Sequence, residues 1–154
     1  MPMQKALDAL KDVRLEGRME IIGTEPPVVI DGSHTAYSIR RLLDSCKEIF
    51  GEGGVLVFGS VKGKNYQAML DLLIPSFDEV IISEPQGFKE TDVDAVYAYA
   101  KSLGKAALEK SPEKALELAI DKASKLGSKK PVVVTGSFYL AGAVKKYITE
   151  RNRT

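Results

Sequence analysis

Three short polar stretches carry side chains that could do chemistry, and each follows an apolar run. Asp31-Gly32-Ser33-His34 follows the first of these runs and contains the only histidine in the chain, whereas Phe58-Gly59-Ser60 and Thr135-Gly136-Ser137 follow two others. Glycine lets a ligand approach the backbone closely, and a helix that begins after such a turn offers unpaired N–H groups to an anion. In open α/β sheets, ligands bind outside the carboxyl ends of the strands. We therefore predict a ligand-binding edge formed by these stretches.

Each candidate side chain also has a purely structural alternative. Asp31 could accept a hydrogen bond from a ribose or an ammonium group, or it could bond the backbone of its own turn. His34 could contact a ligand or a neighbouring carbonyl, and Ser137 could cap the helix that follows it. Lys62 and Lys64 lie in a loop, where lysines are usually solvated.

A small hydrolase using Ser137, His34 and Asp31 is a third possibility, because these residue types form catalytic triads. The chain has no G-x-S-x-G nucleophile elbow, which argues against this possibility. It also has no G-x-x-x-x-G-K-[ST] phosphate-binding loop, no G-x-G-x-x-G dinucleotide motif and no cluster of Cys and His that would predict a metal site.

The composition indicates an ordinary globular domain. The chain has 154 residues, 44% of them hydrophobic and 28% charged, with a net charge of +1 and a single cysteine. We expect one domain over residues 1–154. The near-neutral charge gives no reason to expect a nucleic acid as partner, one cysteine excludes an internal disulfide, and no apolar run reaches the ~20 residues of a membrane span. A cytoplasmic protein is the resulting expectation.

Apolar runs alternate with segments of helical periodicity, a pattern typical of an α/β fold with a mostly parallel, Rossmann-like sheet of about six strands and helices on both faces. The link between the first two strands is too short for a parallel crossover, so we expect the first strand to be antiparallel. Cys46 falls on the apolar face of its helix, and Thr91 is a plausible N-cap. The expected strands are 19–23, 27–31, 55–59, 79–83, 105–109 and 131–135, and the expected helices are 3–12, 35–50, 65–75, 90–103, 111–126 and 138–150.

The motifs, taken together, resemble one known family. Their order and residue types are similar to those of the C-terminal domain of folylpolyglutamate synthase and dihydrofolate synthase, within the Mur ligase family. The matching segments are Glu16-Gly17-Arg18-Met19-Glu20 (family P-G-R-x-E), Asp31-Gly32-Ser33-His34 (D-G-A-H), Phe58 to Asn65 (F-G-x-x-x-D-K-D), Met69-Leu70 (M-L) and Val134 to Leu140 (V-T-G-S-x-Y-L).

This resemblance implies an ATP-dependent ligase that adds glutamate to a folate. In that chemistry the folate carboxylate is phosphorylated by ATP, and the glutamate amine then attacks the acyl phosphate. By resemblance, Arg18 and Asp31 would contact ATP, at its phosphates and ribose. His34, Ser137 and Lys64 would hold the incoming glutamate or the reacting end.

The resemblance also implies that part of the enzyme is missing. The family's phosphate-binding loop, its Mg²⁺ ligands and its central ATPase domain precede the region that this chain matches. We therefore expect the chain alone to be inactive, and to need a central P-loop domain in cis or in trans that holds ATP and Mg²⁺.

The chain departs from the family pattern at several positions. Glu16 replaces a proline, Thr35-Ala36 replaces Asn-Pro, and Gly63 and Asn65 replace both acids of D-K-D. These departures motivate an alternative function: a stand-alone module that binds a nucleotide or another small ligand and has no ligase activity.

Overall fold

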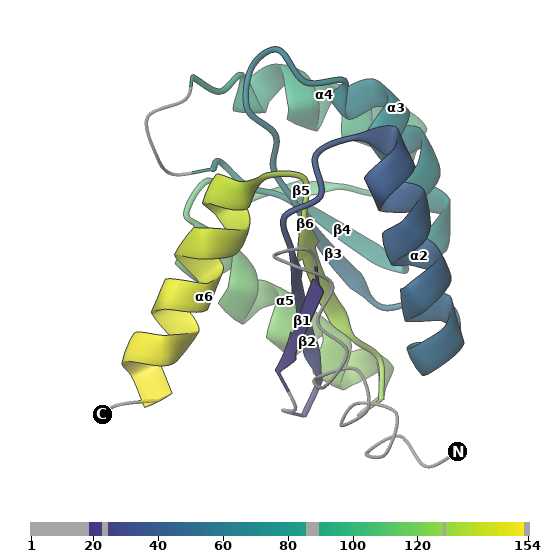
Figure 1. Cartoon of the computed structure of the whole chain (residues 1–154), viewed down its shortest axis with the longest axis vertical. Helices are drawn as coiled ribbons and strands as arrows, with labels where there is room; N and C mark the ends of the chain where they lie inside the picture. The colour runs from purple at the N-terminus through teal and green to yellow at the C-terminus, as the bar shows by residue number, and fades with distance from the viewer. Residues whose placement is uncertain (1–18, 23–24, 86–89, 128, 153–154) are drawn as a thin grey trace.

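The computed structural model describes residues 19–22, 25–85, 90–127 and 129–152. Within these ranges the chain forms one six-stranded sheet flanked by helices (Figure 1). The expected helix over 3–12 and the Glu16-Gly17-Arg18 segment lie outside the described residues. The elements are β1 (Met19–Ile22), β2 (Val28–Asp31), α2 (Ala36–Phe50), β3 (Val55–Phe58), α3 (Tyr66–Leu73), the 3₁₀ turn η1 (Ile74–Ser76), β4 (Glu79–Ile82), α4 (Val93–Leu103), β5 (Ala107–Leu108), α5 (Pro112–Leu126), β6 (Val132–Thr135) and α6 (Phe138–Asn152).

The strand order is β1-β2-β6-β3-β4-β5, which places the last strand of the chain between β2 and β3. β1 runs antiparallel to β2, as expected, and the other pairs are parallel. The register aligns Ile30 with Val134 and Phe58 with Thr135. Because β2, β6 and β3 are parallel neighbours, the three polar stretches that follow them lie at the same edge of the sheet.

Helices cover both faces of the sheet, which confirms the expected fold class. α2, α3 and α4 pack on one face, and α5 and α6 pack on the other. Successive strand residues alternate between the faces: Val29 packs under α2, whereas Ile30 packs under the other pair of helices. Strands buried on both sides need apolar residues at every position, which explains the continuous run of β3.

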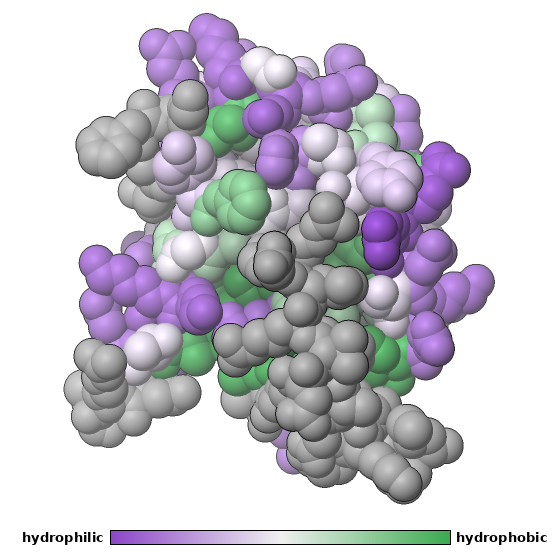
Figure 2. Space-filling view, in the orientation of Figure 1, coloured by the Kyte–Doolittle hydropathy of each residue, from purple (hydrophilic) through white to green (hydrophobic). Residues whose placement is uncertain are grey.

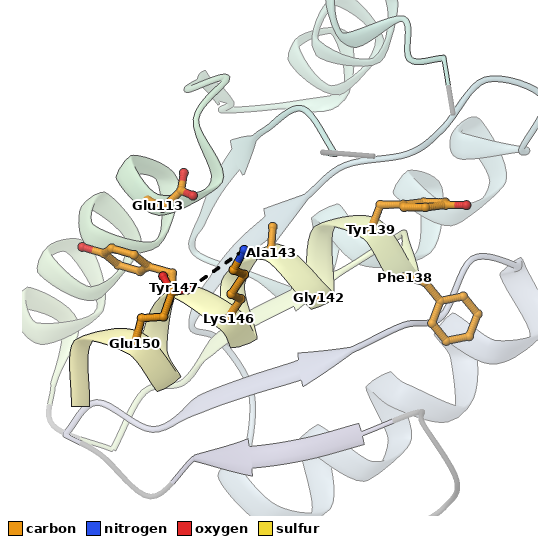
Figure 3. A pocket seen from close by; sticks show the side chains of 8 residues that line it. All are labelled: Glu113, Phe138, Tyr139, Gly142, Ala143, Lys146, Tyr147 and Glu150. Atoms are coloured by element: carbon orange, nitrogen blue, oxygen red, sulfur yellow. Dashed lines mark ion pairs between the residues drawn. The ribbon is translucent and has the colours of Figure 1, made fainter. Parts of the chain in front are cut away.

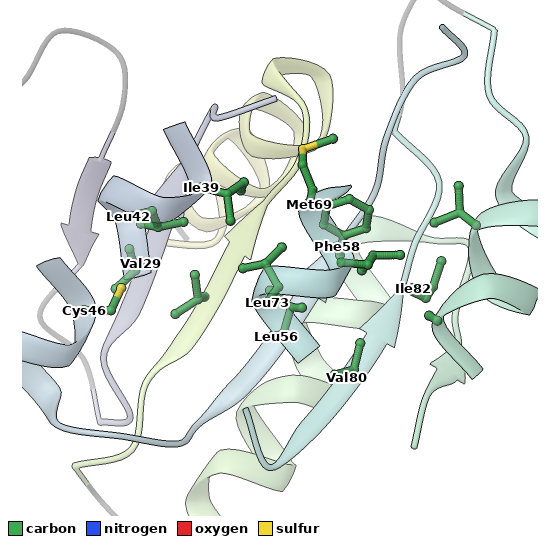
Figure 4. Close-up of a cluster of buried hydrophobic side chains, with 14 of the residues drawn as sticks. Val29, Ile39, Leu42, Cys46, Leu56, Phe58, Met69, Leu73, Val80 and Ile82 are labelled. Carbon is green, nitrogen blue, oxygen red and sulfur yellow. The ribbon is translucent and has the colours of Figure 1, made fainter. Parts of the chain in front are cut away.

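Figure 4 shows the core beneath α2 and α3, where Cys46 lies beside Leu42 and Val29. Burial, with a smaller contribution from the charge of Asp31, raises the pKa of the Cys46 thiol to about 12. The thiol is therefore protonated at neutral pH and is not a nucleophile, in agreement with a core role.

Both ends of α5 lie where the sequence predicts them. Ser111 caps α5 by accepting from the backbone N–H of Lys114, and Gly127 ends that helix. The interpretation of Thr91 as an N-cap is wrong: Asp92 caps α4, and Thr91 instead forms a β-bridge with Val61. Asp competes well for the N-cap position, and Thr suits extended backbone.

The expected strand over 105–109 is shorter than predicted, because only the two residues of β5 pair with β4. In the space-filling view, hydrophilic residues gather along the upper and lateral margins, and hydrophobic ones show mainly toward the middle of this face (Figure 2). None of the helices in the described ranges combines the length and apolar character that a membrane crossing requires.

Candidate functional site

The end of β6 joins the polar stretches that follow β2 and β3. The Thr135 hydroxyl donates to Asp31 Oδ2 over 3.0 Å, and the Gly136 N–H donates to the Ser33 carbonyl over 3.0 Å. On the other side, the Gly59 N–H donates to the Thr135 carbonyl over 3.3 Å. The predicted convergence of the three stretches is therefore present, and it is made by hydrogen bonds as well as by adjacency.

Asp31 is buried at the centre of this arrangement, with 2% of its surface exposed. Its Oδ2 accepts from the Ser33 N–H over 2.8 Å as well as from Thr135. A buried carboxylate requires such donors, because losing water without replacing its hydrogen bonds is costly. Asp31 thus holds the turn after β2 in place. Its predicted contact with a ribose stays a prediction.

Gly136 lets the loops approach one another closely. Its φ is +110°, and a Cβ at this position would lie 2.4 Å from the Gly59 carbonyl oxygen and 2.7 Å from the Phe58 ring. Both the backbone conformation and the space therefore require glycine here.

His34 is half-buried at the mouth of α2. Its Nδ1 lies 3.2 Å from the Gly32 carbonyl oxygen, and its ring packs at 5.3 Å between centroids against the Phe138 ring. Because a carbonyl oxygen only accepts, this bond requires a proton on Nδ1, and in the neutral imidazole Nε2 then carries the lone pair. The turn therefore sets a tautomer in which Nε2 can accept a hydrogen bond from an ammonium or a hydroxyl group.

Ser137 caps α6, which was the structural alternative for this residue. Its Oγ accepts from the Tyr139 N–H over 3.0 Å, its carbonyl accepts from the Ala141 N–H, and the residue is 2% exposed. The N-terminus of a 15-residue helix therefore begins next to His34 and Asp31, where it favours negative charge.

Lys64 is not brought to these residues by the described contacts. It is exposed in the loop between β3 and α3, and that loop pairs instead with the segment before α4, where the Lys62 N–H donates to the Glu90 carbonyl. Gly63 occupies a turn with a φ of +93°, and the Asn65 side chain caps α3. The two residues that replace the acids of D-K-D thus serve the local backbone.

The described contacts do not form a hydrolytic triad. In a triad the acid orients the histidine, and the histidine activates the serine. Here Asp31 bonds to Ser33 and Thr135, His34 Nδ1 faces the Gly32 carbonyl, and the Ser137 hydroxyl caps a helix. In the described ranges, no group of three acidic, His or Cys side chains is placed to hold a metal ion.

A groove of about 560 Å³ runs along α6, from Phe138, the residue whose ring packs on His34, to Glu150 near the end of the helix (Figure 3). Gly142 and Ala143 form its shallow middle, and the exposed Lys146 and Glu150 pair at 4.0 Å on its rim. A hydrogen bond to Glu117 raises the pKa of Tyr147. Apart from Glu113 of α5, the lining comes from α6, and none of the polar residues that line the groove is buried.

Comparison with known proteins identifies the family. Residues 17–138 match the model of the Mur ligase, glutamate ligase domain. The match covers most of the chain and all of the joined strand ends, the three polar stretches at 31–34, 58–60 and 135–137. The chain belongs to this family.

Relatives of this glutamate ligase domain include longer proteins. The folylpolyglutamate synthase of Lacticaseibacillus casei is 31% identical over 129 residues, which are 84% of this chain and 28% of that protein. Among solved structures, the folylpolyglutamate synthase of Thermotoga maritima has a TM-score of 0.76 at 27% identity, covering 92% of this chain and 32% of that one. The Mycobacterium tuberculosis folylpolyglutamate synthase complexed with ADP and AMPPCP has a TM-score of 0.77 at 25% identity, covering 85% and 31%.

Two residues of the glutamate ligase domain gained importance only from the structure. Thr135 was visible as part of a motif but had no role, because its partner Asp31 lies 104 positions earlier in the chain. Phe138 gave no signal as the ring beside His34, although 57% of it is exposed. The position of β6 between β2 and β3 explains both contacts.

Proposed function

We propose that this domain forms one wall of the site of an ATP-dependent ligase that adds glutamate to a folate. The observation that carries the proposal is the joining of Asp31, His34 and the start of α6 at one sheet edge through Thr135 and Gly136. Family membership and the folylpolyglutamate synthases among its relatives support the substrate class.

In this proposal the chain's residues act by positioning and charge. His34 Nε2 accepts a hydrogen bond from the amine of the incoming glutamate and so holds it near the reacting end. The N-terminus of α6, capped by Ser137, stabilises negative charge that develops as the amine attacks the acyl phosphate and phosphate leaves. Asp31 keeps His34 in register and contacts the nucleotide ribose, and Arg18 and Lys64 contact phosphate and the reacting end.

The proposal includes a separate P-loop domain, in cis or in trans, that supplies the phosphates' main binding loop and the ligands for Mg²⁺. The chain spans about 28% of the Lacticaseibacillus casei enzyme, so most of such an enzyme corresponds to other residues. The exposed Tyr37 and Phe138 rings, 70% and 57% accessible at the first turns of α2 and α6, are suited to contact with that domain.

A chimera tests this proposal directly. The chain replaces the matching segment of the Lacticaseibacillus casei enzyme, and incorporation of labelled glutamate into a folate is followed with and without ATP. We expect ATP-dependent ligation that falls by at least about tenfold in His34→Ala. Glu150→Ala, in the groove of Figure 3, is the matched control and is expected to leave the rate unchanged. A folded chimera without ATP-dependent ligation would contradict the proposal.

A second candidate is a stand-alone module that binds a nucleotide or another small ligand without ligation. The observation that favours it is local: Gly63 and Asn65 serve the turn and the cap of α3, where the family pattern has acids. A thermal-shift screen of nucleotides and amino acids on the chain alone tests it. A shift with a ligand in a chain that gives no active chimera would favour this candidate, and the absence of any shift would count against it.

A further inference from the structure

Thr135 is the last residue of the central strand β6 and is completely buried. We propose that Thr135 is a positioning residue of the candidate site: its hydroxyl holds the Asp31 carboxylate and, through it, the turn that carries His34. The inference rests on the proposed function only in taking His34 as a residue that faces the ligand.

The hydrogen-bond geometry defines the direction of this interaction. A carboxylate only accepts, so the Thr135 hydroxyl must donate to Asp31 Oδ2 over their 3.0 Å separation. The same oxygen accepts from the Ser33 N–H over 2.8 Å. One carboxylate oxygen therefore ties the end of β6 to the turn after β2. Because Asp31 and Ser33 are 2% and 5% exposed, water has little access with which to replace the hydroxyl.

Two further contacts run between the same segments, and both bear on His34. The Gly136 N–H donates to the Ser33 carbonyl over 3.0 Å, and the Phe138 ring packs against the His34 ring. Of the three contacts, only the bond from Thr135 can be removed by exchanging a hydroxyl for a methyl group. A single substitution therefore isolates the contribution of this bond.

The sequence of β6 indicates why the hydroxyl matters. Val132, Val133 and Val134 precede Thr135, and all four residues are fully buried. A fourth valine would have nearly the shape of threonine and would suit the strand better, because a buried hydroxyl must be bonded to avoid a penalty. The feature that threonine adds at this position is its donor, and the partner of that donor is Asp31.

The test compares Thr135→Val, which loses the hydroxyl and keeps the shape, with Thr135→Ser, which keeps the hydroxyl and loses a methyl group. Both are made in the full chain. His34 is the only histidine, so its imidazole gives a single set of NMR resonances that needs no assignment by mutation. The second readout is hydrogen exchange of the Ser33 amide. The control Val133→Ala shortens an equally buried side chain of the same strand.

We expect Thr135→Val to displace the His34 resonances and to speed exchange of the Ser33 amide by at least about tenfold, because both depend on the position of Asp31. Thr135→Ser is expected to keep both readouts as in the parent chain, even though it loses packing. Val133→Ala is expected to lower the free energy of unfolding without moving the His34 resonances.

Two results would overturn the proposal. One is a Thr135→Val chain whose His34 resonances and Ser33 exchange match those of the parent. The other is a Thr135→Ser chain in which both change, and this result counts even if the valine variant does not fold. None of these readouts involves nucleotide, glutamate or folate. An inactive chimera together with the expected NMR result would therefore overturn the proposed function and leave the positioning role of Thr135 standing.

Discussion

The joined strand ends after β2, β6 and β3 and the groove along α6 are built in opposite ways. The strand ends contain buried polar residues, a glycine that no other residue can replace, and hydrogen bonds between segments more than 100 positions apart. The groove is a hollow of about 560 Å³, yet its lining comes largely from one helix and its Lys146–Glu150 ion pair is exposed. The difference teaches that pre-organised polar groups, rather than available volume, mark the candidate site in this fold.

Substitution of Gly136, the glycine at the end of β6, should have the largest effect on stability. Gly136→Ala places a Cβ 2.4 Å from the Gly59 carbonyl oxygen at a φ of +110°. Backbone strain and overpacking together should lower the free energy of unfolding by about 3 kcal/mol or more. Urea denaturation measures this loss. A loss below about 1 kcal/mol would mean that the strand ends are less tightly packed than described.

Removing the Asp31 carboxylate should have the second largest effect on stability. Asp31→Ala leaves the Ser33 N–H and the Thr135 hydroxyl buried without their acceptor, so we expect a loss of about 2–3 kcal/mol in the free energy of unfolding. Asp31→Asn is the matched control, since its amide oxygen can still accept both bonds, and it should cost less. Equal losses in the two variants, again by urea denaturation, would contradict the importance of these donors.

Cys46 lies in the core, where burial and, to a smaller degree, the charge of Asp31 raise the pKa of its thiol. Its pKa is raised from 9.0 to about 12 on folding, so the unfolded chain loses the proton first as the pH rises. The resulting stabilisation is complete below pH 9.0 and is lost progressively between 9.0 and about 12. Between pH 8 and 10 we expect the free energy of unfolding to fall by about 1 kcal/mol more in the parent than in Cys46→Ala. Parallel pH profiles for the two chains would be the contrary result.

Substitution of Gly142, in the groove, should have the smallest effect on stability, and this effect should be a gain. A Cβ at this position meets no other atom within 4 Å, and the residue lies inside α6. Gly142→Ala should therefore raise the free energy of unfolding by about 0.5–1 kcal/mol, because alanine favours the helix more than glycine does. Thermal unfolding measures the gain. Destabilisation would show that the groove, too, depends on a close approach.

The sequence predicted the fold class, the antiparallel first strand and the three strand ends, because these depend on local apolar patterning and on the length of one turn. It could not predict that β6 lies between β2 and β3, since strand order arises from packing across the whole sheet. The pairing of Thr135 with Asp31 and of Phe138 with His34 follows from that order. The role of Lys64 stays a prediction: its motif groups it with His34, and the structure shows only that its loop pairs with the segment before α4.

The most direct test of the account is an NMR titration of the chain with excess ADP and then excess glutamate, following the His34 imidazole and the backbone amides together. The account predicts shifts at His34, Ser33 and Gly136, with the amides of Gly142 and Lys146 in the groove unchanged. Shifts confined to the groove, or a saturating ligand that leaves His34 unmoved, would contradict the claim that the joined strand ends are the binding site.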